Sequence, residues 1–456
     1  RVCVWSNNSY HYAVNCYGVM MAGGVIVPMN QRKSWAEMSH ELELVEPAAI
    51  LTDGEDYGSK EQLEAAYGSL LHPMDEFRRY EPAAELHPIG HDDLMVLMFT
   101  SGTTGEPKGA IITHNNLLCA IDAYTQKLNL TAADSTILAV PIYHITGLSA
   151  LLALFISLGA SIWLQHRFNA PQVITTLREQ NITFLHGSPT IFILLCQAAR
   201  EQSASHPGDF PALRTIACGA GHLSDGLIKE LKTLFPHTAI QPIYGLTETT
   251  SPATIFPGDV WGSDKCGSSG QAIPGLAITI RNDHQQPLPA GQIGHIWLKG
   301  DVVIREYWQH SERRPSCDAQ GWFCTGDLGY LDDEGWLYIK DRSKDMINRG
   351  GEKIYSLELE NILSTYRGVR EVAVIPTPSP VYGEEPVAFI VPDGQHHLTS
   401  EEILDWLKVK IARFKLPARI IFTRALPRTH NGKVSKQQLK TRLAESIITL
   451  STEDKK

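Results

Sequence analysis

Residues 94–109 read "LMVLMFTSGTTGEPKG", an apolar run followed by a stretch rich in hydroxyl groups and glycine that ends beside a lysine. An apolar run of this length is typical of a buried strand. Glycines let backbone N–H groups approach an anion closely, and Ser, Thr and Lys side chains donate further hydrogen bonds to it. The stretch therefore predicts a strand that leads into a phosphate-binding loop. A plain flexible turn is the alternative, and the spacing of Gly102, Gly105 and Lys108 is not that of a P-loop ATPase.

Strand-like and helix-like stretches alternate through the first two-thirds of the chain. Such alternation predicts a mostly parallel, doubly wound α/β region with ligand-binding loops at the strand ends. Two amphipathic stretches, residues 170–181 and 224–235, are predicted helices. The predicted strands lie within residues 24–30, 48–53, 94–100, 135–141, 161–165, 182–189, 213–220 and 239–245. From about residue 266 to 340, short strands and turns predict a small β-rich subdomain.

The pattern of predicted helices and strands changes again after Asp341, where we place a hinge. Residues 355–366 and 399–412 are predicted helices, the second with Ser400 as its N-cap, and residues 369–377 and 385–393 are predicted strands. We therefore expect an N-terminal domain over residues 1–340 and a small, mobile α+β domain over 341–456. The chain opens directly on a strand-like run, which suggests that an N-terminal segment is missing.

Composition and charge narrow the class of protein. A net charge of -10 over 456 residues argues against a nucleic-acid binder, which usually carries a basic excess. The eight cysteines show no C-x-x-C or zinc spacing, so we expect free thiols and a cytoplasmic location. Residues 145–164 carry no charge, but their glycines and flanks favour a buried helix followed by a buried strand over a membrane span.

Three later motifs add chemistry that each could arise by chance. Tyr244, Thr247 and Glu248 in "PIYGLTETT" combine an aromatic face for a purine, a hydroxyl for a phosphate and a carboxylate for Mg²⁺. Asp327 in a predicted Thr-Gly-Asp turn is a natural acceptor for ribose hydroxyls. Lys433 follows an Asn-Gly turn, at the tip of a predicted loop. Each motif alone has a simpler interpretation. The first could be a polar loop at the end of a strand, the second an ordinary turn, and the third an exposed lysine without a function.

Together and in this order, these motifs resemble the adenylate-forming family of acyl-CoA synthetases, peptide-synthetase adenylation domains and firefly luciferase. The most specific elements are "TSGTTGEPKG", "YGLTE", the stretch 321–354 and "NGK". The resemblance spans essentially the whole chain. It implies ATP, Mg²⁺ and coenzyme A as ligands, and a C-terminal domain that rotates between two half-reactions.

The resemblance also implies roles for individual residues. Tyr244 would lie against adenine, Thr247 would contact the α-phosphate, Glu248 would hold Mg²⁺ and Asp327 would bind the ribose. Lys433 would bridge the substrate carboxylate and the α-phosphate, with His144 as a gate at the acyl site. The β- and γ-phosphates would be held by Thr100, Ser101, Gly102, Thr103, Thr104, Gly105 and Lys108. The predicted binding set for nucleotide and CoA is completed by Gly219, Ala220, Gly245, Ile339, Arg342, Gly350 and Gly351, the last two passing the pantetheine arm.

The stretch 321–354 is closer to acyl-CoA synthetases than to peptide-synthetase domains, which favours CoA as the acyl acceptor. A ligase that loads a carrier protein and a non-catalytic nucleotide-binding relative are the alternatives. The acid pocket is expected along residues 186–192, 218–223 and 244–252. These stretches contain no Lys or Arg that could form an ion pair with a second carboxylate. A fatty or aryl monocarboxylate is therefore the predicted substrate. An amino acid is less favoured, although Asp225 lies near.

Overall fold

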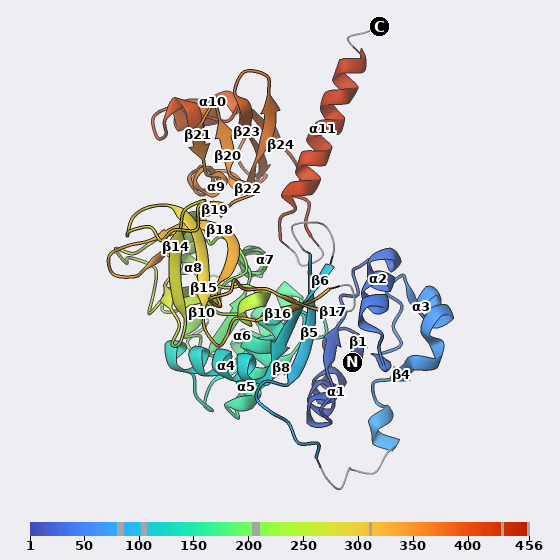
Figure 1. The fold of residues 1–456 in the computed structure, drawn as a ribbon. Helices are drawn as coiled ribbons and strands as arrows, with labels where there is room; N and C mark the ends of the chain where they lie inside the picture. The colour runs from blue at the N-terminus through green and yellow to red at the C-terminus, as the bar shows by residue number, and fades with distance from the viewer. Residues whose placement is uncertain (80–85, 102–106, 203–209, 310–311, 430–432, 454–456) are drawn as a thin grey trace. The chain divides into compact units, whose positions relative to one another are not determined.

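A computed structural model describes residues 1–79, 86–101, 107–202, 210–309, 312–429 and 433–453 (Figure 1). The chain forms two compact units. The first comprises Arg1–Ala220, Leu231–Ile278 and Trp297–Cys324, and the second comprises Gly221–Glu230, Thr279–Ile296 and Thr325–Lys456. The hinge at Asp341 and the domain limits stay predictions.

An eight-stranded sheet opens the first unit. Its strands β1, β2, β3 and β4 are parallel, whereas β5 and β6 form an antiparallel pair that β16 extends. Apolar side chains of the sheet and of its connecting helices share one core, which includes Trp5, Met38 and Leu97. In spatial order the strands are β17 (Glu312–Pro315), β16 (Glu306–Gln309), β6 (Pro107–Thr113), β5 (Leu94–Ser101), β2 (Ile26–Pro28), β1 (Val2–Trp5), β3 (Ala49–Thr52) and β4 (Leu71–Pro73). The connecting helices are α1 (Tyr10–Met21), α2 (Trp35–Val45), α3 (Lys60–Tyr67), η1 (Gly68–Leu70) and η2 (Glu76–Arg79).

A seven-stranded sheet forms the second layer of parallel strands. The pairs β7·β8, β7·β9, β9·β10 and β10·β11 are all parallel, as expected for strands joined by helices. In spatial order the strands are β13 (Gln271–Ala272), β12 (Thr254–Ile255), β11 (Ala239–Tyr244), β10 (Thr215–Cys218), β9 (Phe184–Gly187), β7 (Ser135–Leu138) and β8 (Ser161–Leu164). Helices in this part of the chain are α4 (His114–Leu128), α6 (Ala170–Glu179), α7 (Pro189–Glu201) and α8 (Asp225–Leu234). The predicted strands all form, and the mixed α/β fold class is confirmed.

The charge-free stretch 145–164 divides into a helix and a strand. A π-helix (η3, Thr146–Ala153) continues into α5 (Leu154–Ser157), and β8 follows. The helix is buried as predicted, but β8 is an edge strand whose Trp163 is 42% exposed, so the expectation of a buried strand was wrong. Within the described residues, no helix combines the length and apolar character needed to cross a membrane.

Short strands dominate residues 277–342. A four-stranded sheet has the order β14 (Ala277–Arg281), β15 (Gly294–Lys299), β18 (Phe323–Leu331) and β19 (Leu337–Arg342). The strands β16 and β17 from the same part of the chain instead join the eight-stranded sheet, where β16 pairs with β6. This pairing brings residues near 307 beside the end of the phosphate hairpin.

The C-terminal part of the second unit is a five-stranded sheet with helices on both faces. Alternate residues of β22 and β23 point to opposite faces, so Val374 and Ile390 pack with α9 and α10, whereas Ile375 and Phe389 pack with α11. Thr399, not the predicted Ser400, caps α10, because its hydroxyl accepts from the backbone N–H of Glu402. The elements are β20 (Ile347–Arg349), β21 (Glu352–Ile354), α9 (Ser356–Ser364), β22 (Val369–Ser379), β23 (Gly383–Pro392), α10 (Ser400–Lys408), η5 (Arg413–Lys415), β24 (Arg419–Phe422) and α11 (Lys436–Glu453).

Candidate active site

The predicted phosphate loop connects two antiparallel strands. β5 ends at Ser101, β6 begins at Pro107, and the register pairs Thr100 with Lys108. Thr100 Oγ1 donates to the carbonyl oxygen of Lys108 over 3.4 Å. The hairpin therefore holds Thr100 and Lys108 opposite each other at its end. The predicted phosphate-binding residues Gly102, Thr103, Thr104 and Gly105 lie outside the described residues, as does the side chain of Ser101.

A tyrosine that sequence reasoning missed links this hairpin to the predicted magnesium ligand. Tyr307 lies on β16, opposite Ala110 of β6. Its hydroxyl donates to Oε1 of Glu248 over 2.9 Å, and the ammonium of Lys108 lies 5.8 Å from the centre of its ring. Burial and then the charge of Glu248 raise the pKa of Tyr307 well above its usual value, so the hydroxyl keeps its proton and remains a donor. Lys108 and Glu248 therefore lie against one side chain, although they are distant in sequence.

The surroundings of Glu248 suit a magnesium ion that is shared with phosphate groups. The side chain is half-buried, and no described residue donates a hydrogen bond to its second oxygen, Oε2. Among the described residues, no group of three His, Cys, Asp or Glu side chains could hold a metal. Mg²⁺ is usually bound by one or two carboxylates together with substrate phosphates and water. One carboxylate beside a phosphate hairpin fits that mode of binding.

We expect Tyr307→Phe to lower the rate of adenylate formation by roughly 10- to 100-fold, because a hydrogen bond to a charged group contributes about 1.5–3 kcal/mol. The loss should come with weaker binding of a fluorescent ATP analogue in the presence of Mg²⁺, since the hydroxyl orients Glu248. Tyr330→Phe is the matched control: its ring stacks on Tyr338 with centroids 4.8 Å apart, remote in sequence from Glu248. Equal losses in both variants would contradict a positioning role for Tyr307.

The loops that follow β10 and β11 contain strained backbone. Ala220 has φ +62°, and the consecutive residues Thr250 and Ser251 have φ +54° and +109°. Residues with a Cβ adopt such angles rarely, at a cost of about 1–3 kcal/mol each, and mainly at functional sites. A Cβ on Gly245 would lie 1.6 Å from the carbonyl oxygen of Ser251, so the loop can close on itself only with glycine there. The strain therefore gathers at the carboxyl ends of two neighbouring parallel strands, where α/β sheets bind ligands.

This closed loop presents two predicted residues. Thr247 and Glu248 lie in a short 3-10 helix, η4 (Thr247–Thr249), and both are half-buried. The backbone N–H of Ile304 donates to the carbonyl oxygen of Glu248 over 2.9 Å, which holds the loop in place. Tyr244 ends β11 and is also half-buried. The pairing of β11 before the loop and the hydrogen bond from Ile304 therefore fix the backbone from which these side chains extend.

His144 sits at the start of the π-helix. Its ring lies 4.7 Å from that of Tyr143, and it is half-buried. A Cβ on Gly147 would lie 2.1 Å from the carbonyl oxygen of Pro141, so the chain turns sharply around His144. π-helices are rare and often found at functional sites, which is consistent with the predicted gate.

The predicted ribose ligand belongs to the second unit. Asp327 is 4% exposed and lies within β18, not in the expected turn, because Gly326 adopts φ +76° without ending the strand. The register of β18 and β19 pairs Asp327 with Arg342, whose Nε lies 3.3 Å from Oδ1 of Asp327. Ile339 lies on the same strand as Arg342, opposite Gly329, and is half-buried. Adjacent strands thus bring Asp327, Ile339 and Arg342 to one sheet.

The predicted residues for the thiol and the catalytic lysine are exposed. Gly350 and Gly351 join β20 to β21 with φ +60° and +95°, angles that favour glycine, and no side chain would fit there without strain. Gly350 N–H donates to the carbonyl oxygen of Tyr382 over 2.7 Å. Lys433 closes a loop in which the N–H of Thr429 donates to its carbonyl oxygen over 2.7 Å. Lys433 therefore lies at the base of this loop and not at its tip, where the sequence pattern placed it.

Asp341, the predicted hinge residue, is 1% exposed and held by several donors. Arg342 N–H and Ser356 Oγ donate to its Oδ1 over 2.8 and 3.1 Å, and Ser356 N–H donates to Oδ2 over 2.5 Å. Ser356 in turn accepts from Lys436 Nζ over 2.6 Å, and this ammonium also lies 2.7 Å from Oε1 of Glu360. Burial raises the pKa of Asp341 to about 6. A buried network thus joins the predicted hinge to the helix that follows Lys433.

This shift predicts how stability depends on pH. The pKa of Asp341 in the folded chain is above the ordinary value of 3.8, so the folded state binds more protons between about pH 4 and 6. The contribution of Asp341 to stability is therefore full below pH 4 and falls as pH rises through 6. We expect the difference in unfolding free energy between the parent and Asp341→Asn to decrease from pH 4.5 to 7, measured by urea titration. A constant difference would show that the pKa is not shifted, and an increasing difference would show a shift of the opposite sign.

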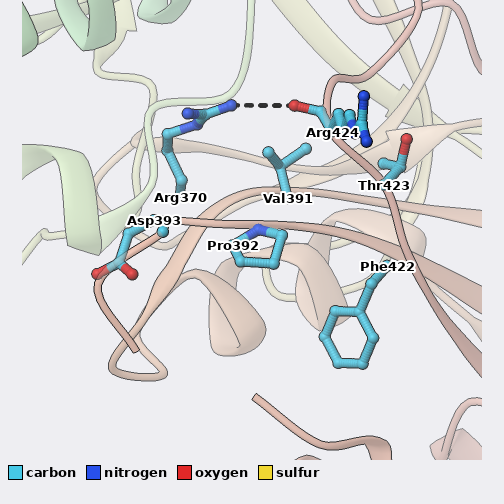
Figure 2. Close-up of a pocket in the computed structure, with 8 residues that line it drawn as sticks. Arg370, Val391, Pro392, Asp393, Phe422, Thr423 and Arg424 are labelled. Atoms are coloured by element: carbon cyan, nitrogen blue, oxygen red, sulfur yellow. Dashed lines mark hydrogen bonds between the residues drawn. The ribbon is translucent and has the colours of Figure 1, made fainter. Parts of the chain in front are cut away.

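The described residues also form two cavities, and no predicted site residue lines either of them. The larger one, in the second unit, is lined by Arg370, Val391, Pro392, Asp393, Gly394, Phe422, Thr423 and Arg424, and Figure 2 shows Arg370 donating to the carbonyl oxygen of Arg424. The second cavity lies beside His186 of β9, next to the strand ends described above.

The family profile of AMP-binding enzymes matches residues 1–308, and the profile of the AMP-binding enzyme C-terminal domain matches residues 358–433. A feruloyl-CoA synthase from an Amycolatopsis species is 31% identical over 444 residues, which cover 97% of this chain and 88% of that protein. A fatty acid–acyl-carrier-protein ligase from Streptomyces coeruleorubidus is 29% identical, over 96% of this chain and 86% of that protein.

A solved structure shares the fold along nearly the whole chain. The O-succinylbenzoate coenzyme A synthetase from Bacillus subtilis, in complex with ATP and magnesium ion, superimposes with a TM-score of 0.83 at 29% identity, covering 96% of this chain and 89% of the other. Both the profiles and the relatives therefore extend over most of the sequence. The chain belongs to the AMP-binding enzyme family of adenylate-forming enzymes, in its acyl-CoA synthetase branch.

Proposed function

We propose that this acyl-CoA synthetase activates a fatty or aryl monocarboxylic acid with ATP and Mg²⁺, and then transfers the acyl group to the thiol of CoA in the cytoplasm. The observation that carries the proposal is the Lys108–Tyr307–Glu248 arrangement, in which a phosphate-hairpin lysine and a carboxylate lie against one tyrosine. That arrangement suits the triphosphate of ATP. The free cysteines are consistent with a reducing compartment.

In the first half-reaction, an oxygen of the substrate carboxylate attacks the α-phosphorus of ATP. The bond to pyrophosphate breaks, and an acyl-adenylate forms. Tyr244 supports adenine, Asp327 accepts from the ribose hydroxyls and Thr247 donates to the α-phosphate. Two anions must meet, so the ammonium of Lys433 contributes most where their repulsion is greatest.

Glu248 would hold Mg²⁺, which would supply positive charge to stabilise the developing charge on the phosphates. Tyr307 keeps Oε1 of Glu248 oriented, and no described residue donates a hydrogen bond to Oε2. Lys108 and the hydroxyls of the hairpin, including Thr100, bind the phosphates that leave as pyrophosphate. The chain thereby supplies orientation and charge, which dominate the catalysis of phosphoryl and nucleotidyl transfer.

In the second half-reaction, the thiol of CoA loses its proton and its sulfur attacks the acyl carbonyl carbon. The carbon–oxygen bond to AMP breaks. Gly350 and Gly351 carry no side chains that would obstruct a pantetheine arm, which supports their predicted place beside it. Rotation about Asp341 would exchange Lys433 for this glycine pair between the two steps.

The residues at the strand ends, where the acid pocket is expected, indicate how many carboxylates the substrate carries. Gly187 ends β9 and Gly219 directly follows the neighbouring strand β10, and Gly219 N–H donates to the carbonyl oxygen of Gly187 over 3.0 Å. Small residues leave room there, and neither Lys nor Arg occurs in the three expected pocket stretches. A second carboxylate would lack a counter-charge, so the proposed substrate has one carboxylate.

Acid-dependent exchange of labelled pyrophosphate into ATP tests the proposal, with a panel of fatty, aryl, dicarboxylic and amino acids. We expect exchange with monocarboxylates, and AMP release that depends on CoA. Transfer to a phosphopantetheinylated carrier protein in place of CoA would favour the second candidate, which the similarity to a carrier-protein ligase supports. Absence of exchange with every acid would favour a non-catalytic nucleotide-binding relative.

A further inference from the structure

Three polar side chains meet inside the first unit, and the proposed mechanism gives none of them a role. His186 Nε2 lies 3.4 Å from the hydroxyl of Tyr124, and that hydroxyl lies 2.8 Å from Oγ of Ser251. Their exposed fractions are 5%, 0% and 7%. The residues come from β9, α4 and the strained loop after β11, so only the fold brings them together.

One atom of this cluster has no partner. Nδ1 of His186 is fully buried, and no described residue forms a hydrogen bond with it. An unpaired polar atom in the interior costs about 1–3 kcal/mol, so such an atom calls for an explanation. Burial lowers the pKa of His186 to about 3, and the imidazole is therefore neutral at ordinary pH. It offers one hydrogen bond and no charge.

The cluster lies at the ligand-binding end of the sheet. His186 is the penultimate residue of β9 and pairs in register with Ala217, the penultimate residue of β10. A Cβ added to Gly219 would lie 3.5 Å from Cε1 of His186, so the imidazole faces a stretch of backbone without a side chain. Two residues with strained backbone lie close to it. Ala220 follows Gly219 in the sequence, and Ser251 belongs to the cluster itself. These are the loops expected to line the acid pocket.

The other walls beside His186 are apolar. The cavity next to it is lined by Ile137, Val140, Phe168, Leu185, Ile191 and Phe192, among others. This cavity is small, about 10 Å³, so it has room for a single small group such as a hydroxyl, which would meet hydrocarbon on most sides and one neutral nitrogen. Such a pocket, apolar with a single placed polar group, is typical of sites that select a ligand by orientation.

We infer that Nδ1 of His186 recognises a hydroxyl group on the acyl portion of the acid, so that the preferred substrate is a hydroxylated monocarboxylate rather than a plain hydrocarbon one. The inference rests on the proposed function and names its substrate class. A hydroxyl both donates and accepts, and it therefore satisfies Nδ1 in either tautomer of the neutral ring. Tyr124 holds the ring through Nε2, and Ser251 holds the Tyr124 hydroxyl, which makes both positioning residues.

The test uses pairs of monocarboxylates that differ by one hydroxyl, both aryl and alkyl, in the pyrophosphate-exchange assay with the full chain. In the parent we expect kcat/KM for the hydroxylated member to be about 10- to 100-fold higher, because a site built to bond a hydroxyl is left unpaired by the analogue that lacks it. His186→Leu should reduce this ratio to near one, mainly by raising KM for the hydroxylated acid.

His186→Asn is the matched variant, because its amide reaches the position of Nδ1 and can still donate or accept. It should retain most of the preference, which a merely structural role for His186 would not predict. Equal rates for the two members of each pair in the parent, or a preference that survives in His186→Leu, would overturn the inference and leave the proposed function standing. Absence of exchange with any acid in the parent would overturn both. Thermal unfolding of each variant confirms that it is folded.

Discussion

Lys433→Ala is expected to lower the rate of acid-dependent pyrophosphate exchange by about 10²–10³-fold, the effect of losing one preorganised group that stabilises developing charge. Lys433 is exposed at the base of a loop that begins at Thr429, so its removal leaves no cavity and should not change the unfolding free energy. The loss should be confined to adenylate formation. When a synthetic acyl-adenylate is supplied with CoA, thioester formation by the variant should stay within a few-fold of the parent.

Lys408→Ala is the control for the loss of a surface charge. Lys408 is exposed on α10 and pairs with Asp405 over 2.7 Å, within one helix and remote in sequence from the loop of Lys433. We expect no more than a small change in either half-reaction, because exposed pairs contribute little. If Lys433→Ala slowed thioester formation as much as adenylation, a role restricted to the first step would be wrong.

Lys436→Met is expected to destabilise the chain by about 3–5 kcal/mol, because it leaves buried carboxylates without their cation. Nζ of Lys436 lies 2.7 Å from Glu360 and donates to Ser356, which binds Asp341. Although burial lowers the pKa of Lys436, Glu360 and Asp341 raise it above its usual value, so the ammonium stays charged. The free energy of unfolding in urea measures the effect.

Two comparisons separate this buried pair from ordinary surface charge. Lys440→Met removes a partly exposed ammonium 3.8 Å from Asp345, and we expect a loss of about 1 kcal/mol or less. The double variant Lys436→Met with Glu360→Met should be more stable than Lys436→Met alone, since an apolar pair of similar volume avoids the unpaired carboxylate. A loss for Lys436→Met no larger than that for Lys440→Met would contradict the network.

Local patterns were sufficient for much of the fold. Each predicted strand of the parallel sheets formed, because apolar runs bounded by turn residues have few other ways to bury themselves. The errors occurred where a local pattern depended on its neighbours. Gly326 and Asp327 read as a turn, yet β18 continues through both, and Asp327 pairs with Arg342 of β19. The run at 161–164 read as a buried strand, but among the described residues no strand pairs with its outer edge.

The sequence by itself determined the order of motifs, the alternation of strands and helices, and the residues that carry hydroxyl, carboxylate and ammonium groups. Only the tertiary structure decided which of these groups meet. Tyr307 reaches Glu248 through the pairing of β16 with β6, and His186 meets Tyr124 through the packing of α4 beside β9. Strand register and packing across long stretches of chain set such contacts, and a side chain's own neighbours in sequence carry no sign of a partner that lies on a distant strand.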